Sequence, residues 1–178
     1  SQKCLALPPG LSLAGVNDRA MAKAATVANR GWYFDLLIME KHRIKNSTAM
    51  TPVIPLVYAL DFQLDRILDE GLESRFARHS AMSQKVYDWS VAHGMPSFAE
   101  ESFRSKTVAT ISYTLNLDIQ AMNKFLLDNY EMRIAGGYGD LKSTTFRIAT
   151  MGEISLNDVD LLLEGMDKFI ALKLILIH

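Results

Sequence analysis

A long helical pattern in the middle of the chain limits most what this sequence can fold into. Apolar residues recur at helical spacing from Ile54 to Leu68, and a second pattern of this kind covers residues 72–92. Gly71 separates the two patterns, and Gly94 stands just past the second, where glycine commonly ends a helix. The sequence therefore predicts two consecutive helices that connect an N-terminal part of the chain to a C-terminal part.

The C-terminal part alternates between strand and helix patterns. The predicted strands cover residues 107–114, 132–135 and 144–150, and the predicted helices cover 118–130 and the stretch after Ser155-Leu-Asn-Asp158, a variant of the capping box. Strand, helix, strand, strand and helix after a helical connector predict a small α+β domain over residues 71–178.

The N-terminal part starts with two short apolar runs, residues 4–7 and 11–16, separated by the strong breaker Pro8-Pro9-Gly10. We expect both runs to be buried strands, followed by a helix over residues 19–28. A strand, a turn, a strand and a helix form a piece of an α/β sheet. The N-terminal part is therefore predicted to be a piece of an α/β sheet, and the fold class is α/β.

Composition narrows the possible functions. With 49% apolar residues the chain can form a core, which excludes a disordered tail. Nineteen basic and 20 acidic residues, with no long Lys/Arg run, argue against a nucleic-acid partner. No signal peptide or apolar run near the ~20 residues of a membrane span is visible, so no membrane partner is expected. The single cysteine, Cys4, favours a reducing, cytoplasmic location.

Few residues stand out as chemical groups. The four histidines show no metal-ligand spacing with each other or with Cys4, so we expect no metal and place them at the surface or at helix ends. The glycine-rich segment 136–139 favours a tight turn with positive φ over a phosphate site. Two cations leave alternatives open. Lys3 is a partly desolvated nucleophile or an exposed terminal lysine, and Arg147 is a carboxylate ligand or an outward-facing strand residue.

Four stretches, taken in order, resemble one family. The run Ser-Gln-Lys-Cys-Leu-Ala-Leu-Pro-Pro-Gly at the N-terminus resembles the segment around the cofactor lysine of class V, fold type I aminotransferases that use pyridoxal phosphate. Within this family the pattern looks like that of the alanine–glyoxylate and serine–pyruvate aminotransferases. Residues 46–60, 70–79 and 134–152 resemble, respectively, the family's phosphate-contacting loop and helix, the start of its small domain, and the stretch with its carboxylate-binding arginine.

The resemblance implies a role for each matching residue. Lys3 would form a Schiff base with pyridoxal phosphate and, once freed, would move a proton between the substrate Cα and the cofactor. Arg147 would bind the substrate α-carboxylate, and Gln2 would line the cofactor site. Thr48 and Thr51 would offer hydroxyls to the cofactor phosphate of the partner subunit, which implies a homodimer with shared active sites.

The implied reaction moves an amino group between a small amino acid, such as alanine or serine, and glyoxylate or pyruvate. In the family the lysine lies deep in the chain, and upstream segments supply other cofactor contacts. The resemblance therefore implies that this chain is a C-terminal part, inactive alone, in which residues 1–70 would end the large cofactor-binding domain and residues 71–178 would form the small domain. Two alternatives stay open. One is a non-catalytic α+β dimerisation or interaction module derived from the family, and the other is a lyase or desulfurase, for which Cys4 is poorly placed.

Overall fold

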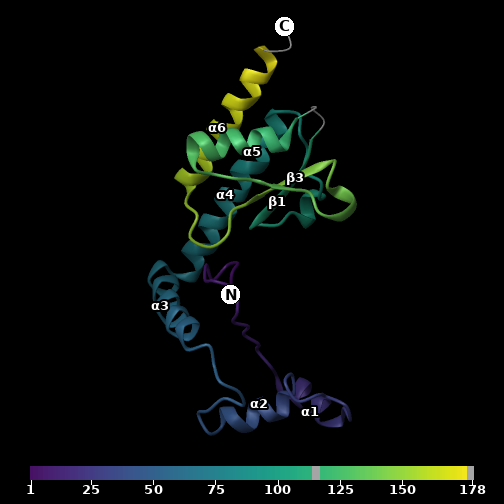
Figure 1. The fold of residues 1–178 in the computed structure, drawn as a ribbon, viewed down its shortest axis with the longest axis vertical. Coiled ribbons are helices and arrows are strands. Elements are labelled where there is room, and N and C mark those ends of the chain that lie inside the picture. The colour runs from purple at the N-terminus through teal and green to yellow at the C-terminus, as the bar shows by residue number, and fades with distance from the viewer. Residues whose placement is uncertain (114–116, 176–178) are drawn as a thin grey trace. The chain divides into compact units, whose positions relative to one another are not determined.

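The computed structural model describes residues 1–113 and 117–175 and divides the chain into two compact units, Ser1–Leu64 and Asp65–His178 (Figure 1). Helix α3, Ile54–Glu70, runs through this boundary. The predicted boundary between two domains, residues 1–70 and 71–178, stays a prediction. Among the described residues, no helix is both long enough and apolar enough to cross a membrane.

The first unit contains α1 (Asp18–Thr26), α2 (Leu36–Arg43) and most of α3. The two strands predicted over residues 4–7 and 11–16 are wrong, because these runs pair with no strand among the described residues. Their hydrogen bonds close locally instead: the Leu7 amide donates to the Ser1 carbonyl at 3.2 Å, and the Ser1 ammonium donates to the Leu11 carbonyl at 3.0 Å. The N-terminal segment is therefore a compact turn.

The first unit has no apolar core of its own. Asp35 and Gln63 are its only buried side chains, all 64 residues being described. Large apolar side chains lie in solvent, among them Trp32, Tyr33 and Phe34, which are 59%, 60% and 78% exposed. The first unit thus leaves in solvent several aromatic side chains that a core of its own would cover.

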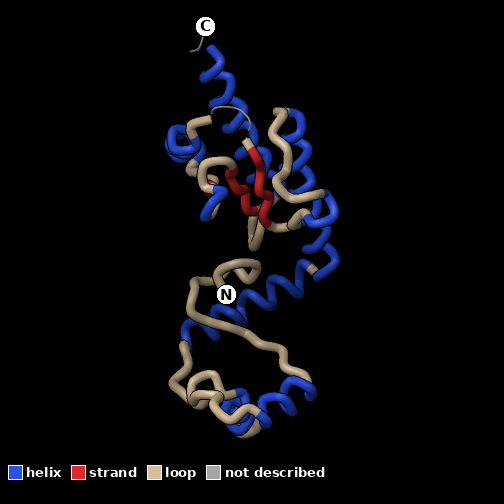
Figure 2. The backbone as a smooth tube through the Cα atoms, turned by 90° about the vertical axis from the view of Figure 1, so that its right-hand side faces the viewer, coloured by secondary structure: helices blue, strands red, loops and turns tan. Residues whose placement is uncertain are grey.

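The second unit contains α4 (Leu72–Ala92), α5 (Ile119–Tyr130), α6 (Leu156–Ile175) and a three-stranded antiparallel sheet in the order β1-β3-β2. Figure 2 shows the strands in red and the helices in blue. The strands are β1 (Val108–Ser112), β2 (Ala135–Gly136) and β3 (Thr145–Ala149), and the short 3-10 helices η1 (Glu101–Phe103) and η2 (Gly139–Leu141) lie in loops. The mixed α/β class is confirmed, as are the helices at 72–92 and 118–130.

The second strand of this unit, predicted over residues 132–135, begins later than predicted. The Ile134 amide donates to the Asn123 side chain of α5 at 2.8 Å, so it is not available to the sheet, and β2 starts only at Ala135. The capping box before α6 is confirmed: Ser155 and Asp158 exchange hydrogen bonds between side chain and backbone at 2.8 and 3.2 Å. Position 114, the predicted end of the first strand, lies outside the described residues.

One face of the sheet joins the core, and the other does not. Alternate residues of β1 and β3, including Ile111, Phe146 and Ile148, are at most 1% exposed and pack with the three helices. Because successive strand residues point to opposite faces, Arg147 projects from the other face, where it is half-buried. The sheet thus buries its apolar side and presents an arginine on the other.

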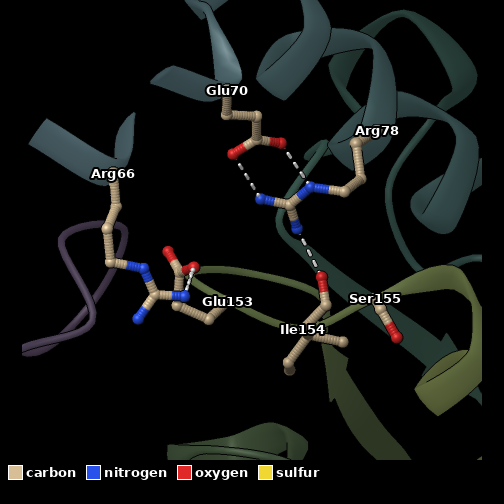
Figure 3. A pocket seen from close by; sticks show the side chains of 6 residues that line it. All are labelled: Arg66, Glu70, Arg78, Glu153, Ile154 and Ser155. Carbon is tan, nitrogen blue, oxygen red and sulfur yellow. Dashed lines mark hydrogen bonds and ion pairs between the residues drawn. The ribbon is translucent and has the colours of Figure 1, made fainter. Parts of the chain in front are cut away.

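A network of ion pairs fixes the junction of α3 and α4, where Gly71 turns the chain at φ +81° (Figure 3). Glu70 accepts from Arg78 Nε at 2.6 Å and from Arg75 Nη1 at 2.7 Å. Arg75 also donates to Glu153 at 3.0 Å, and Arg66 donates to the same carboxylate at 2.9 Å. The network therefore joins the helix junction to the loop between β3 and α6.

This network predicts an acid-sensitive stability. Hydrogen bonds from Arg78 and then Arg75 outweigh burial and lower the pKa of Glu70 from 4.5 to about 2. The ionised form is therefore stabilised in the folded state, so its contribution is complete above pH 4.5 and is lost as the pH falls toward 2. Because the carboxylate is 25% exposed and screened, we expect a contribution of about 1–2 kcal/mol.

Urea unfolding of the 178-residue chain at pH 6 and pH 3 tests this expectation. The Glu70→Gln variant should be less stable at pH 6 and should lose less stability on acidification than the parent chain. Glu101→Gln is the matched control, because Glu101 is exposed and makes no ion pair among residues 1–113 and 117–175. Equal pH dependence in the parent and Glu70→Gln chains would contradict the assignment.

Candidate functional site

The N-terminal turn presents Lys3 and Gln2 to solvent. The turn is closed by the Ala6 amide donating to the Lys3 carbonyl at 2.9 Å, and the Ser1 hydroxyl accepts from the Leu11 amide at 3.2 Å. The Lys3 amine makes no hydrogen bond or ion pair among the described residues, whereas the Gln2 side-chain oxygen accepts from the Ser1 ammonium at 3.3 Å. Lys3 therefore lies at the end of a turn, not of a strand, with its amine available.

Thr48 and Thr51 lie in the loop between α2 and α3. Both side chains are exposed. The Thr48 hydroxyl donates to the Met50 carbonyl at 2.6 Å, so its proton is already engaged. The Thr51 hydroxyl makes no hydrogen bond within the described part of the chain, so it is the better placed of the two to donate to a ligand.

Arg147 has an engaged Nε and open outer nitrogens. Its Nε donates to the Gly136 carbonyl at 2.9 Å, which fixes the orientation of the guanidinium. Its neighbours across the sheet are the small residues Thr110 and Ala135. No carboxylate among residues 1–113 and 117–175 pairs with it, so its two outer nitrogens can receive a carboxylate in a bidentate pair.

The loop after β2 places an aromatic ring beside this arginine. The centre of the Tyr138 ring lies 6.0 Å from the Arg147 Cζ. The chain can close here only because residue 137 is glycine: a Cβ at that position would lie 2.0 Å from the Leu141 carbonyl oxygen. The predicted positive φ is confirmed at Gly139, with φ +55°. The sequence pattern missed Tyr138, although an aromatic residue between two glycines, just before an arginine-bearing strand, was a usable signal.

The predicted site residues fall into two groups. Gln2, Lys3, Thr48 and Thr51 belong to the first unit, and Arg147 belongs to the second. Within the first unit the end of the N-terminal turn at Gly10 approaches the start of α3, since a Cβ on Gly10 would lie 3.0 Å from Leu56 Cδ1. The structure therefore brings the lysine turn close to the helix that follows the threonine loop.

Other candidate groups serve the fold. The prediction that all histidines are superficial is wrong for His79, which is 7% exposed with Nδ1 2.6 Å from the Thr150 carbonyl oxygen; His178 lies outside the described residues. Within the described residues, no three His, Cys, Asp or Glu side chains gather as a metal site. Cys4 is exposed and not in a buried strand. The pocket at the α3–α4 junction is lined by the ion pairs already described, so its charges are satisfied.

The chain was compared with known proteins. No protein-family model matches it. It is 36% identical over 154 residues to an uncharacterized aminotransferase of Methanocaldococcus jannaschii, covering 85% of this chain and 40% of that protein. It is 31% identical over 156 residues to the L-aspartate–glyoxylate aminotransferase of Paracoccus denitrificans, covering 87% of this chain and 39% of that protein.

The fold agrees with a solved structure of the same kind. The crystal structure of alanine–glyoxylate aminotransferase from Nostoc sp. superposes with a TM-score of 0.83 at 26% identity, covering 94% of this chain and 45% of that one. The chain thus spans about two fifths of the length of the relatives that it matches. Sequence and fold lead to one conclusion: the homologues of this chain are class V aminotransferases, and the chain is consistent with their C-terminal part.

Proposed function

We propose that this chain forms part of a pyridoxal-phosphate-dependent aminotransferase. The enzyme would move an amino group between a small amino acid, such as alanine or serine, and glyoxylate or pyruvate. The observation that carries the proposal is the Arg147 guanidinium, which is oriented by the Gly136 carbonyl and has no carboxylate partner among the described residues. A fixed arginine of this kind matches the α-carboxylate that amino acids and 2-oxo acids share.

The donor groups present suit the cofactor. The Lys3 amine is unengaged within the described residues, and the Thr51 hydroxyl is free to donate to a phosphate. When bound, pyridoxal phosphate serves as an electron sink for charge that develops on the substrate. Lys3 would anchor the cofactor, with Gln2 beside it, and Thr48 and Thr51 would contact the phosphate. Of the two threonines, Thr48 must first release its hydrogen bond to Met50.

Two residues of the chain would have different roles in the reaction, one in substrate binding and one in proton transfer. Arg147 would hold the substrate by its α-carboxylate, which orients the Cα–H bond. The freed Lys3 amine would act as the acid and base of the reaction, moving the proton between the substrate Cα and the cofactor carbon. Separate groups thus handle binding and proton transfer.

A homodimer with shared active sites, in the cytoplasm, completes the proposal. Its support is the first unit, which buries no apolar side chain and leaves Trp32, Tyr33 and Phe34 exposed. A second subunit packed against this unit would cover such surface. The 178-residue chain by itself is expected to be inactive.

Borohydride reduction of the protein purified from its native source tests the cofactor assignment. Intact and peptide mass spectrometry should find a pyridoxyl mass on the lysine of the Ser-Gln-Lys-Cys peptide. The same measurement reports the length of the native polypeptide. An unmodified lysine in freshly purified protein would contradict the proposal and favour the non-catalytic dimerisation or interaction module.

A further inference from the structure

Tyr138 is exposed in a way that the fold does not explain. Its side chain is 82% exposed, more than any other large apolar side chain among the described residues. Singly exposed apolar residues need no special reason. This one differs because its ring lies 6.0 Å from the guanidinium of Arg147, the proposed carboxylate ligand.

The backbone holds Tyr138 in place. The Gly137 amide donates to the Thr145 carbonyl at 2.8 Å, and the Leu141 amide donates to the Tyr138 carbonyl at 3.1 Å. The Thr145 hydroxyl, on β3, closes the loop by donating to the Leu141 carbonyl at 3.0 Å. The ring is therefore carried on a loop that is tied to the same strand as Arg147.

The side chains on either side of Arg147 in the sheet are short. Thr110 and Ala135, its neighbours on either side in the sheet, are too short to cover the guanidinium. Tyr138 is the one aromatic ring that lies over this guanidinium among the residues described, and an aromatic face close to a guanidinium attracts it and excludes water from that side.

We propose that Tyr138 is a positioning residue for the carboxylate of the substrate. Its ring shields one face of the Arg147 guanidinium, so that the carboxylate of a small amino or 2-oxo acid binds along the open edge formed by the two outer nitrogens. This inference rests on the proposed function, because it assigns Tyr138 to the same site. The shielding comes from the ring and not from the phenolic hydroxyl, so a phenylalanine at position 138 should function as well as the tyrosine.

Steady-state kinetics of the complete polypeptide encoded by the gene that carries these residues test the proposal, with L-alanine and glyoxylate as substrates. Tyr138→Ala should raise KM about two- to five-fold for both substrates, the size of an exposed cation–π contact, and should leave kcat within about two-fold. Tyr138→Phe should match the parent. Phe103→Ala, which removes a ring 78% exposed on η1, is the matched control and should also match the parent.

The Arg147→Lys variant distinguishes a failure of the role of Tyr138 from a failure of the proposed function. Lysine keeps the charge of arginine but loses the bidentate fork. A higher KM for Arg147→Lys with an unchanged KM for Tyr138→Ala overturns the role of Tyr138 and keeps the proposed function. An unchanged KM for both variants, or no turnover in the parent enzyme, overturns the proposed function and this inference with it. A loss of kcat in Tyr138→Ala that Tyr138→Phe shares also contradicts it.

Discussion

Replacing Lys3 with alanine in the complete polypeptide is expected to remove both the covalently held cofactor and the activity. The amine of Lys3 is exposed and unengaged among the described residues, so no other part of the fold depends on it. Loss of a group that transfers a proton at the reacting carbon costs about 10²–10⁴-fold in rate. We therefore expect turnover to fall by at least this factor while the folded structure is retained.

Two measurements check the Lys3→Ala prediction. Mass spectrometry after borohydride reduction should find no pyridoxyl mass on the N-terminal peptide, and the transamination rate should fall as stated. Lys23→Ala is the matched control, because Lys23 is also exposed and lies on α1. Normal turnover by Lys3→Ala would rule out its proposed role, whereas equal losses in both variants would indicate a nonspecific effect on folding.

Replacing Gly137 with alanine is expected to destabilise the second unit and to disturb the site at the same time. The new methyl group would lie 2.0 Å from the Leu141 carbonyl oxygen and 2.4 Å from the Thr145 hydroxyl oxygen. Backbone must move to relieve such overlap, at a cost of about 3 kcal/mol. Because Tyr138 is the next residue, the same movement should raise KM for substrate.

The neighbouring glycine supplies the control. An added Cβ at Gly136 would meet no atom within 4 Å, so Gly136→Ala should change stability by less than about 0.5 kcal/mol. Urea unfolding of the 178-residue chain measures both variants. Equal stability of Gly137→Ala and Gly136→Ala would show that the loop tolerates the extra atom, and would remove the support for a fixed position of Tyr138.

Local patterns predicted the elements whose stabilising contacts are close in sequence. The helix at 72–92 was predicted with its observed bounds, since its apolar spacing and the glycines on either side are local signals. The capping box at Ser155 and the strand around Arg147 were recognisable for the same reason. The resemblance of four ordered stretches then gave the family and the candidate Lys3, which no single pattern could have shown.

Tertiary structure decided what depends on partners far away in the chain. The runs at 4–7 and 11–16 carry strand-like composition, but a strand exists only when a neighbour receives its hydrogen bonds, and here the backbone bonds to its own turn. The Arg75–Glu153 pair joins residues 78 apart, and Ile134 joins the Asn123 side chain instead of the sheet. The approach of Tyr138 to Arg147 likewise required the folded loop. Sequence thus determined the family and most elements of the second unit, whereas the meeting of side chains at the site was decided by the three-dimensional fold, because such contacts carry no local periodicity.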